Sequence, residues 1–424
     1  MGDLLVYISL FLIWAMLFYH AFLMLGGYLH HSKYMDFKRL ISKNPPSLPV
    51  VSVLIPAHNE EVVIDDTLRA MTKLQYPKDK LEIILINDNS SDQTGAIGEK
   101  FSSQFPYIKT VHTRPPYSGK GKSSALNYGL TKSRGEMIVV YDADNLPEPD
   151  AVMNLALALA NDKKAGAVVG KFRVINAGKN LLTRLINSET LTFQWLAQAG
   201  RWYWFKMATI PGTNFAIRRS ILEKSGGWDE KALSEDTELS IRVYNMGFHI
   251  RFFPAAITWE QEPENLRVWW KQRTRWARGN LYVILKYFLQ FYKLESKKVL
   301  LDLFYFLFTY YLFFGGVLLS HGIFITNLFY DLELTIGPVS YMLLIAGFLL
   351  FVTEVCLALS LEKDQLTKKN FVTVLFMYFT YSQMWVVLVI YASFLEAKRV
   401  MLKQESVWYK TQRFKQPAEK NHAS

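Results

Sequence analysis

Four long apolar stretches limit what this chain can fold into. Residues 4–25 contain no Lys, Arg, Asp or Glu, and they cover the roughly 20 residues that a membrane-spanning helix needs. Three further stretches, 299–328, 336–361 and 371–395, hold no Lys or Arg, and their only acids are Asp302 and Glu354. Core helices of a soluble protein, the alternative, rarely stay so free of charge over this length. We therefore predict an N-terminal transmembrane anchor over 1–29 and a C-terminal transmembrane region over 299–395, in which Glu354 faces the protein interior.

The basic residues of the chain follow the membrane ends. The formal net charge is +11, and residues 27–50 carry four Lys or Arg against one Asp. Because cytoplasmic loops hold such an excess, we expect the N-terminus outside the plasma membrane and residues 30–298 inside. A membrane surface accounts for the charge, so we expect no nucleic-acid partner. The single cysteine, Cys356, excludes a disulfide within one chain.

The sequence leaves the side of the C-terminal tail open. The 362–370 loop holds three lysines, and the basic tail, 396–424, holds seven Lys or Arg against three Glu, which places both inside. Three single crossings after the central region would instead put the tail outside. Either one stretch is not a simple crossing, with a break at Gly315-Gly316 as the first candidate, or the tail violates the charge rule.

Residues 48–262 alternate between short β-branched runs and helical stretches. Strands are predicted at 51–55, 81–86, 108–112 and 137–141, with helices at 94–103 and 123–133. This alternation predicts an α/β domain with a mainly parallel sheet, whose ligands bind at the carboxyl ends of the strands. Asp88 and Asp142 both fall at such ends. Residues 263–298, rich in basic and aromatic side chains, are predicted to form amphipathic helices at the membrane surface.

The motif Asp142-Ala143-Asp144 directly follows a predicted strand. Two carboxylates held one residue apart on a turn repel each other unless a cation is shared between them. Mg²⁺ typically takes one or two carboxylates together with substrate phosphate oxygens. We therefore expect Asp144 and Asp142 to hold a divalent metal ion. An ordinary surface turn, which Asn145 and Pro147 would also suit, is the alternative.

Two further elements are candidates for nucleotide binding. Asp88 lies in a turn rich in Asn and Ser, where it suits recognition of a base or ribose, although such residues also cap helices. The glycine- and lysine-rich loop at 119–124 is not a P-loop, because the position of its first glycine holds Pro116. A basic loop that opens a helix still suits a diphosphate, through the helix dipole and Lys122. A solvated lysine loop is an equal alternative.

The motif Ser234-Glu235-Asp236 opens a predicted helix. Taken alone, its acids are explained by the helix dipole and by capping. In series with the preceding motifs, Asp236 suits a general base that takes a proton from an attacking hydroxyl, with Glu235 beside it. A turn at Gly212-Thr213 would let the backbone approach the same acceptor, and an ordinary turn is an equal alternative.

The run Gln272-Arg273-Thr274-Arg275-Trp276 lies within the amphipathic segment. Its basic and aromatic residues suit a helix on the membrane surface. In addition, we expect Gln272, Arg275 and Trp276 to face the domain. The Arg275 guanidinium would there oppose pyrophosphate charge, and the Trp276 indole would stack on an acceptor sugar.

Together these motifs resemble those of the processive, membrane-embedded, inverting glycosyltransferases of family 2, such as the cellulose, hyaluronan, chitin and poly-N-acetylglucosamine synthases. The resemblance runs in motif order from Val51 to about Gly279. It implies a GT-A-type fold for 48–262, a UDP-sugar donor, and Mg²⁺ or Mn²⁺ as the cofactor. Ser234 is a mild departure, since the family has Thr at this point of its Thr-Glu-Asp motif.

The resemblance also implies a role for each matched residue. Asp88 and Lys122 would bind the nucleotide, and Asp144 with Asp142 would bind the metal and the diphosphate. Asp236 would be the catalytic base. The family's Gln-x-x-Arg-Trp signature and its acceptor end are matched by Gln272, Arg273, Arg275, Trp276, Gly212 and Thr213.

The function implied is transfer of a sugar from a UDP-sugar to a growing polysaccharide, poly-β-N-acetylglucosamine-like or another exopolysaccharide, by a plasma-membrane enzyme with a cytoplasmic catalytic domain. Its partners would be the donor, the glycan acceptor and the bilayer, and the small membrane part leaves room for an export or accessory subunit. One alternative is transfer of a single sugar to a membrane lipid. Another is a non-catalytic transport or partner subunit. Residues 408–413 also resemble a gating-loop motif of some family members.

Overall fold

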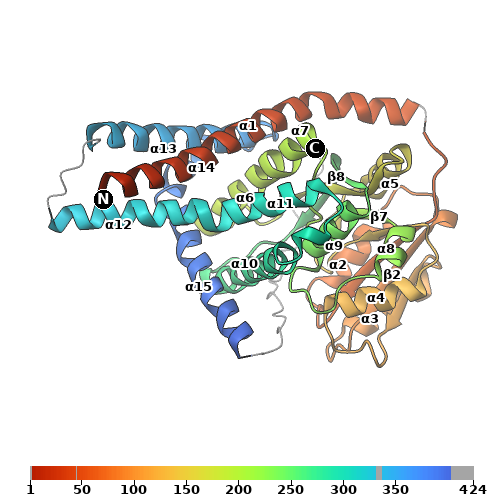
Figure 1. Cartoon of the computed structure of the whole chain (residues 1–424). Helices are drawn as coiled ribbons and strands as arrows, with labels where there is room; N and C mark the ends of the chain where they lie inside the picture. The colour runs from red at the N-terminus through yellow and green to blue at the C-terminus, as the bar shows by residue number, and fades with distance from the viewer. Residues whose placement is uncertain (1, 44, 331–336, 403–424) are drawn as a thin grey trace.

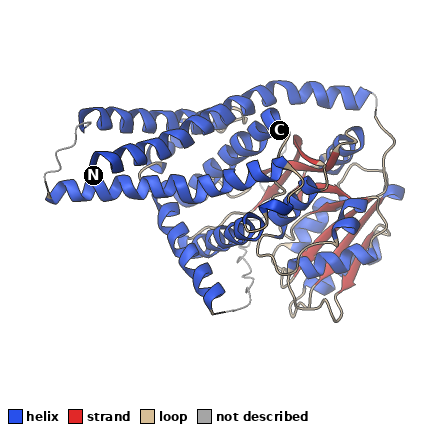
Figure 2. Cartoon of the chain, in the orientation of Figure 1, coloured by secondary structure: helices blue, strands red, loops and turns tan. Residues whose placement is uncertain are grey.

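The computed structural model describes residues 2–43, 45–330 and 337–402. Figure 2 shows two regions, a domain that holds all the drawn strands at one end of the molecule, and long helices that extend away from it. The tail motif at 408–413 lies outside the described residues. The two regions correspond to the charged central part of the sequence and to its apolar ends.

A mixed sheet of eight strands forms the centre of the domain, in the order β3-β2-β1-β4-β7-β6-β8-β5. The first four strands in this order are parallel, as the sequence predicts, whereas β7 is antiparallel to both β4 and β6, and β5 is antiparallel to β8. The strands are β1 (Val51–Ala57), β2 (Leu81–Asn87), β3 (Ile108–His112), β4 (Met137–Val140), β5 (Leu146–Pro147), β6 (Ala165–Val174), β7 (Phe215–Arg218) and β8 (His249–Glu260).

Helices cover both faces of this sheet, because parallel strands expose apolar side chains on both sides. Every residue of β2 and β4 is buried. One core contains α2, α3 and α5, and the other contains α4, α8 and α9. The bounds are α2 (Ile64–Thr72), a 3₁₀ turn (Lys78–Lys80), α3 (Thr94–Gln104), α4 (Lys122–Lys132), α5 (Ala151–Asn161), α8 (Arg219–Ser225) and α9 (Glu235–Asn245).

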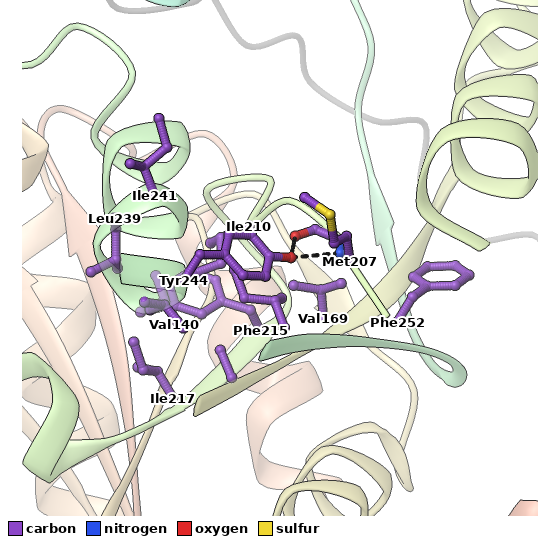
Figure 3. Close-up of a cluster of buried hydrophobic side chains, with 14 of the residues drawn as sticks. Val140, Val169, Met207, Ile210, Phe215, Ile217, Leu239, Ile241, Tyr244 and Phe252 are labelled. Atoms are coloured by element: carbon purple, nitrogen blue, oxygen red, sulfur yellow. Dashed lines mark hydrogen bonds between the residues drawn. The ribbon is translucent and has the colours of Figure 1, made fainter. Parts of the chain in front are cut away.

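Apolar residues between Leu239 and Tyr244 hold the helix α9 against the sheet. Figure 3 shows Leu239, Ile241 and Tyr244 of this helix beside Val140 of β4 and Phe215 of β7. The Tyr244 hydroxyl also hydrogen-bonds the backbone of Ala208, accepting from its N–H at 2.8 Å. This packing fixes the first turn of α9, which carries two of the predicted catalytic acids.

A second group of helices joins the sheet to the membrane region. They are α6 (Leu181–Thr192), a π-helical segment (Phe193–Gly200), α7 (Arg201–Phe205), α10 (Leu266–Phe288) and a 3₁₀ turn (Phe291–Lys293). The long helix α1 (Gly2–Lys43) packs on the π-helical segment so closely that a Cβ on Gly27 would lie 2.1 Å from the carbonyl oxygen of Trp195. The C-terminal half of α1 therefore belongs to the domain surface.

Among the residues that the structure describes, three helical spans are long and apolar enough to cross a membrane, namely Asp3–Lys43, Lys297–Phe329 and Met342–Ser360. The second joins α11 (Lys297–Leu307), a π-helical segment (Phe308–Phe313) and α12 (Phe314–Phe329), and the third belongs to α13 (Gly337–Ser360). In Figure 1, α1, α12 and α13 lie side by side. Glu354 of α13 is buried, as its position in an apolar stretch predicts.

The break in the apolar region is not where the sequence suggested it. Gly315 and Gly316 lie in α12, within a helical span that continues from Lys297 to Phe329. The prediction of a break at these glycines is therefore wrong. The last apolar stretch is divided instead into α14 (Lys368–Met377) and α15 (Tyr381–Met401), whose axes differ by 42°. Figure 1 shows α15 running across the direction of α12 and α13. A stretch that composition alone marks as a span is thus a bent helix pair.

Candidate active site

One cavity of about 1240 Å³ brings the sequence-predicted residues together. It opens at the carboxyl ends of β1, β2 and β4 and continues beneath α10. All of the predicted site residues line it, although they come from six separate parts of the chain. They are Asp88, Lys122, Asp142, Asp144, Gly212, Thr213, Glu235, Asp236, Gln272, Arg273, Arg275 and Trp276.

Asp88 lies where β2 ends, and its side chain holds a loop in place. Its Oδ1 accepts hydrogen bonds from the Thr113 hydroxyl and from the Gly119 N–H, both at 2.8 Å. Only 4 % of the residue is exposed. Asp88 therefore orders the glycine- and lysine-rich loop at the cavity mouth as well as lining the cavity.

Lys122 begins α4, and its ammonium group lies among acidic side chains. Its Nζ is 2.6 Å from Asp142 Oδ1 and 3.7 Å from Glu235 Oε1, and it donates to the Gly212 carbonyl at 2.9 Å. Burial alone would lower the pKa of Lys122, but these carboxylates outweigh it and raise that pKa. The residue is therefore a buried cation at the centre of the site and not a solvated loop lysine.

The turn after β4 aims its two acids at the same space. The Asp142 N–H donates to Thr213 Oγ1 and to Asn145 Oδ1, each at 3.1 Å, so Thr213 fixes the turn. The Asp144 residue is 5 % exposed. In the described part of the chain, no group of three His, Cys, Asp or Glu could hold a metal by itself. The pair Asp142 and Asp144, which lines the cavity, fits Mg²⁺ or Mn²⁺ shared with a diphosphate, because such ions take one or two carboxylates plus substrate oxygens.

Asp236 is a half-buried carboxylate in the first turn of α9. Its Oδ1 accepts from the Thr237 N–H at 2.7 Å. Burial, and after it the neighbouring Glu235 carboxylate, raise the pKa of Asp236 to about 7, although Lys122 opposes the shift. A carboxylate with such a pKa is suited to accept a proton near neutral pH. The Ser234 side chain makes no capping hydrogen bond, so capping alone does not explain the motif.

Gly212 leaves room for this base. Its φ of +84° lies in the left-handed region, and a Cβ built on it would lie 2.9 Å from Asp236 Oδ2. The same residue accepts the hydrogen bond from Lys122 through its carbonyl. Glycine at this position thus allows the base and the cation to approach one backbone segment.

The Gln-x-x-Arg-Trp element lies on α10 and lines the cavity. Arg273 is almost wholly buried, donates to Gln272 Oε1 and to Glu189 Oε2 at 2.8 Å each, and lies 3.9 Å above the Trp276 ring. The charge of Arg275 acts on Asp236, whose pKa it lowers. Arg273, which Gln272 and Glu189 hold, therefore packs on Trp276, while the charge of Arg275 reaches Asp236.

The sequence motifs do not reach the far end of the cavity. Aromatic residues of the membrane region line it together with Glu189 of α6, and no local motif marked them, since aromatic residues in apolar helices mostly serve packing. The additional lining residues include Glu189, Phe193, Tyr305, Phe306, Tyr310 and Trp385. The cavity thus has a polar, charged end near Asp88 and an aromatic end between α10 and α15.

Comparison with known proteins identifies the family. The model of the family described as "Glycosyltransferase like family 2" matches residues 46–279, more than half of the chain. The chain belongs to this glycosyltransferase family. It is 64 % identical to the "Probable glycosyltransferase YdaM" of Bacillus subtilis, over 98 % of this chain and 99 % of that one. Family membership confirms the predicted enzyme class.

More distant relatives differ in what their names state. A beta-monoglucosyldiacylglycerol synthase of Trichormus variabilis is 33 % identical, over 57 % of this chain and 51 % of that one. A poly-beta-1,6-N-acetyl-D-glucosamine synthase of Staphylococcus aureus is 30 % identical, over 58 % of each. The structure of a mannosyltransferase from Pyrobaculum calidifontis, in complex with GDP-Man and Mn²⁺, covers 91 % of this chain and 100 % of its own, with a TM-score of 0.56 at 18 % identity. This likeness confirms the predicted GT-A-type fold.

Proposed function

We propose that this enzyme transfers a sugar from a UDP-sugar to a hydroxyl group of a growing glycan at the membrane surface, with inversion at the anomeric carbon. The observation that carries the proposal is the single cavity with two chemically different ends. Its volume of about 1240 Å³ exceeds the roughly 300–1,000 Å³ of a typical site for one small ligand. Donor and acceptor can therefore occupy it together, on either side of Asp236.

In the proposed reaction, Asp236 accepts the proton of the acceptor hydroxyl as that oxygen attacks the anomeric carbon. The bond between this carbon and the diphosphate oxygen breaks, and the diphosphate leaves with the electron pair. Lys122 and Arg275 stabilise the negative charge that develops on the leaving group. Asp142 and Asp144 would hold a divalent cation, which supplies further positive charge to the diphosphate when bound. Asp88 would contact the nucleoside at the outer end.

The aromatic end of the cavity favours a saccharide acceptor. Planar apolar side chains there carry satisfied polar edges: the Tyr310 hydroxyl accepts from Asn280 Nδ2 at 2.9 Å, and the Trp385 indole N–H donates to Glu189 at 2.8 Å. Such a lining suits a sugar ring, which has C–H groups on its face and hydroxyls at its edge. Addition of a single sugar to a lipid is the second candidate, because the glucosyldiacylglycerol synthase is about as similar as the polysaccharide synthase.

UDP release tests this proposal directly. Protein in nanodiscs is given a panel of UDP-sugars with Mg²⁺ or Mn²⁺, and Asp236→Asn serves as the inactive control. We expect release with one donor, lost in the variant, and a ladder of products on a gel. A single added sugar would reject the growing-glycan acceptor, and donor binding without release by any UDP-sugar would reject the proposed reaction.

A further inference from the structure

We propose that Glu189 is a positioning residue, which holds Trp385 of α15 against the cavity so that the indole binds a sugar ring of the acceptor. The proposal rests on the function proposed above and specifies its acceptor end. Glu189 lies on α6 in the catalytic domain, whereas Trp385 belongs to the last apolar stretch of the chain. Both line the same cavity as Asp236.

The Glu189 carboxylate joins three donors from two helices. Its Oε2 accepts from Arg273 Nη2 at 2.8 Å and from the Tyr381 hydroxyl at 2.7 Å, and its Oε1 accepts from Trp385 Nε1 at 2.8 Å. Hydrogen bonds to a carboxylate are about twice as strong as neutral ones. One side chain of α6 therefore links α15 to the Gln-x-x-Arg-Trp helix α10 at the cavity.

The indole that Glu189 holds is one wall of an aromatic enclosure. The Trp385 ring centroid lies 6.5 Å from that of Tyr310, which in turn stacks on Phe306 at 6.5 Å and 23°. Trp276 closes the same space from α10, beneath the Arg273 guanidinium. The N–H edge of Trp385 is used by Glu189, so the flat faces of the ring are the surface offered to a ligand. A carboxylate and a guanidinium in the same wall favour a polyhydroxylated ring over an acyl chain.

Binding of a saccharide separates this role from a merely structural one. The probe is a β-1,6-linked oligosaccharide of N-acetylglucosamine, titrated into protein in nanodiscs, together with its KM in the UDP-release assay. We expect Trp385→Ala to weaken oligosaccharide binding about tenfold and to raise the oligosaccharide KM by a similar factor. Trp385→Phe should recover most of the affinity, and Glu189→Gln should reproduce the Trp385→Ala effect. Phe379→Ala, on an exposed ring outside the cavity, is the matched control.

Three outcomes would overturn the proposal. The first is an unchanged oligosaccharide affinity in Trp385→Ala, and the second is an equal loss of oligosaccharide affinity in Phe379→Ala. The third is an enzyme that diacylglycerol vesicles stimulate but that does not bind the oligosaccharide. The substitution Glu189→Gln also weakens the hydrogen bond to buried Arg273. If the Glu189→Gln variant does not fold, the result for Trp385→Ala decides the proposal. Acceptor-free UDP release reports separately on the proposed reaction, and its failure does not affect the binding measurement.

A different set of contacts supports a second inference: we infer that α14 and α15 do not cross the bilayer, so that residue 402 stays on the side of the catalytic domain. The segment before α14 is tied to the domain, because Glu362 pairs with Lys171 at 2.6 Å and Gln365 accepts from Asn187 at 2.9 Å. The far end of α15 is tied to it as well, since Glu396 pairs with Arg278 of α10 at 3.1 Å.

The course of α15 between these ties agrees with this inference. Trp269 of α10 donates to the Tyr381 hydroxyl at 2.8 Å at the start of α15, and Arg399 at its end lines the cavity. Figure 1 shows α15 crossing the direction of the membrane-length helices. Its outer face is apolar, with Val387, Ile390 and Phe394 exposed, as expected of a helix that lies on the membrane surface.

Thiol labelling tests the sidedness. Cys356→Ala removes the single cysteine, and single cysteines are then placed at exposed positions by Lys363→Cys, Leu402→Cys and Tyr330→Cys. With a membrane-impermeant maleimide on intact cells, Leu402→Cys should react as Lys363→Cys does and oppositely to Tyr330→Cys. Reaction of all three after permeabilisation shows that each thiol is accessible. Labelling of Leu402→Cys together with Tyr330→Cys would show that α14 and α15 cross.

Discussion

At the scale of single residues, the environment of Asp236 decides what its carboxyl group can do. Burial and the adjacent Glu235 raise its pKa to about 7, while the charges of Lys122 and Arg275 act in the opposite direction. The result is a group that is neither an ordinary surface acid nor permanently protonated. The proposed base role gives this residue two testable properties.

Removing the carboxylate should remove the base. Asp236→Asn keeps the size of the side chain, and we expect UDP release to fall by at least about 10²-fold, within the roughly 10²–10⁴-fold that general base catalysis contributes. Donor binding and the melting temperature should stay close to wild type. Asp65→Asn, the same change on the exposed face of α2, should leave activity unaltered. An Asp236→Asn enzyme of near-normal rate would place the base elsewhere.

The pH dependence should follow the same carboxyl group. Its deprotonated form is the active one, so kcat should fall as pH decreases through about 7 and should level off above it. The measurement is a pH–rate profile between pH 5 and pH 9, at saturating substrates, with each sample tested for recovery after return to pH 8. A rate that stays constant down to about pH 5 would mean that a carboxyl with an ordinary pKa is the base.

Gly212 should be required for two distinct reasons. Gly212→Ala must adopt a left-handed φ, which costs roughly 1–2 kcal/mol, and its Cβ would also press against Asp236 Oδ2 at 2.9 Å. Gly226→Ala is the matched control, because its φ of +80° is similar but nothing lies within 4 Å of the added Cβ. We expect similar losses of stability and a much larger loss of kcat in Gly212→Ala. Equal kcat in the two variants would contradict the contact.

At the scale of elements, buried ion pairs connect the membrane helices to the catalytic domain. Asp302 of α11 pairs with Arg201 of α7, and Glu362, just after α13, pairs with Lys171 at 2.6 Å and with Arg173 at 2.8 Å. Both Asp302 and Lys171 are buried. The elements are therefore fixed to each other by polar contacts in addition to apolar packing.

Breaking one of these connections should destabilise the whole protein. Glu362→Gln leaves Lys171 buried without its counter-charge, which typically costs about 3–5 kcal/mol. We expect a clearly lower melting temperature in nanodiscs. Glu223→Gln removes the acid of an exposed pair with Arg219 and should change stability by less than about 1 kcal/mol. Equal melting temperatures for the two variants would show that the Glu362 contacts are not formed.

At the scale of the whole molecule, the membrane helices and the sheet contribute to one cavity. Its charged end lies at the carboxyl ends of parallel strands, and its aromatic end includes residues of α11 and α15. The two ends meet at Asp236. The cavity, and with it the proposed site, therefore depends on the relative placement of both regions.

Metal removal should abolish activity, because in the proposed mechanism Asp142 and Asp144 hold the cation and the donor diphosphate completes its coordination. We expect excess EDTA to stop UDP release and Mg²⁺ or Mn²⁺ to restore it, whereas Asp144→Ala should stay inactive with added metal. Donor binding is measured separately, with and without metal. Removing the metal should weaken donor binding to the wild-type enzyme, and should weaken it much less in Asp144→Ala. Sustained turnover in excess EDTA would contradict a metal-dependent mechanism.

The sequence by itself determined which local elements form. Strand periodicity, the acids that follow β2 and β4, and the absence of charge over membrane lengths are local properties, so β1 to β4, Asp88, Asp142 and the spanning helices were predictable. The tertiary structure alone decided that β7 joins the sheet in the antiparallel direction, that Lys122 faces carboxylates, and that α15 returns to α10. These depend on contacts between residues far apart in the chain, such as Glu189 with Trp385, and the burial and charge that result leave no local pattern in the sequence.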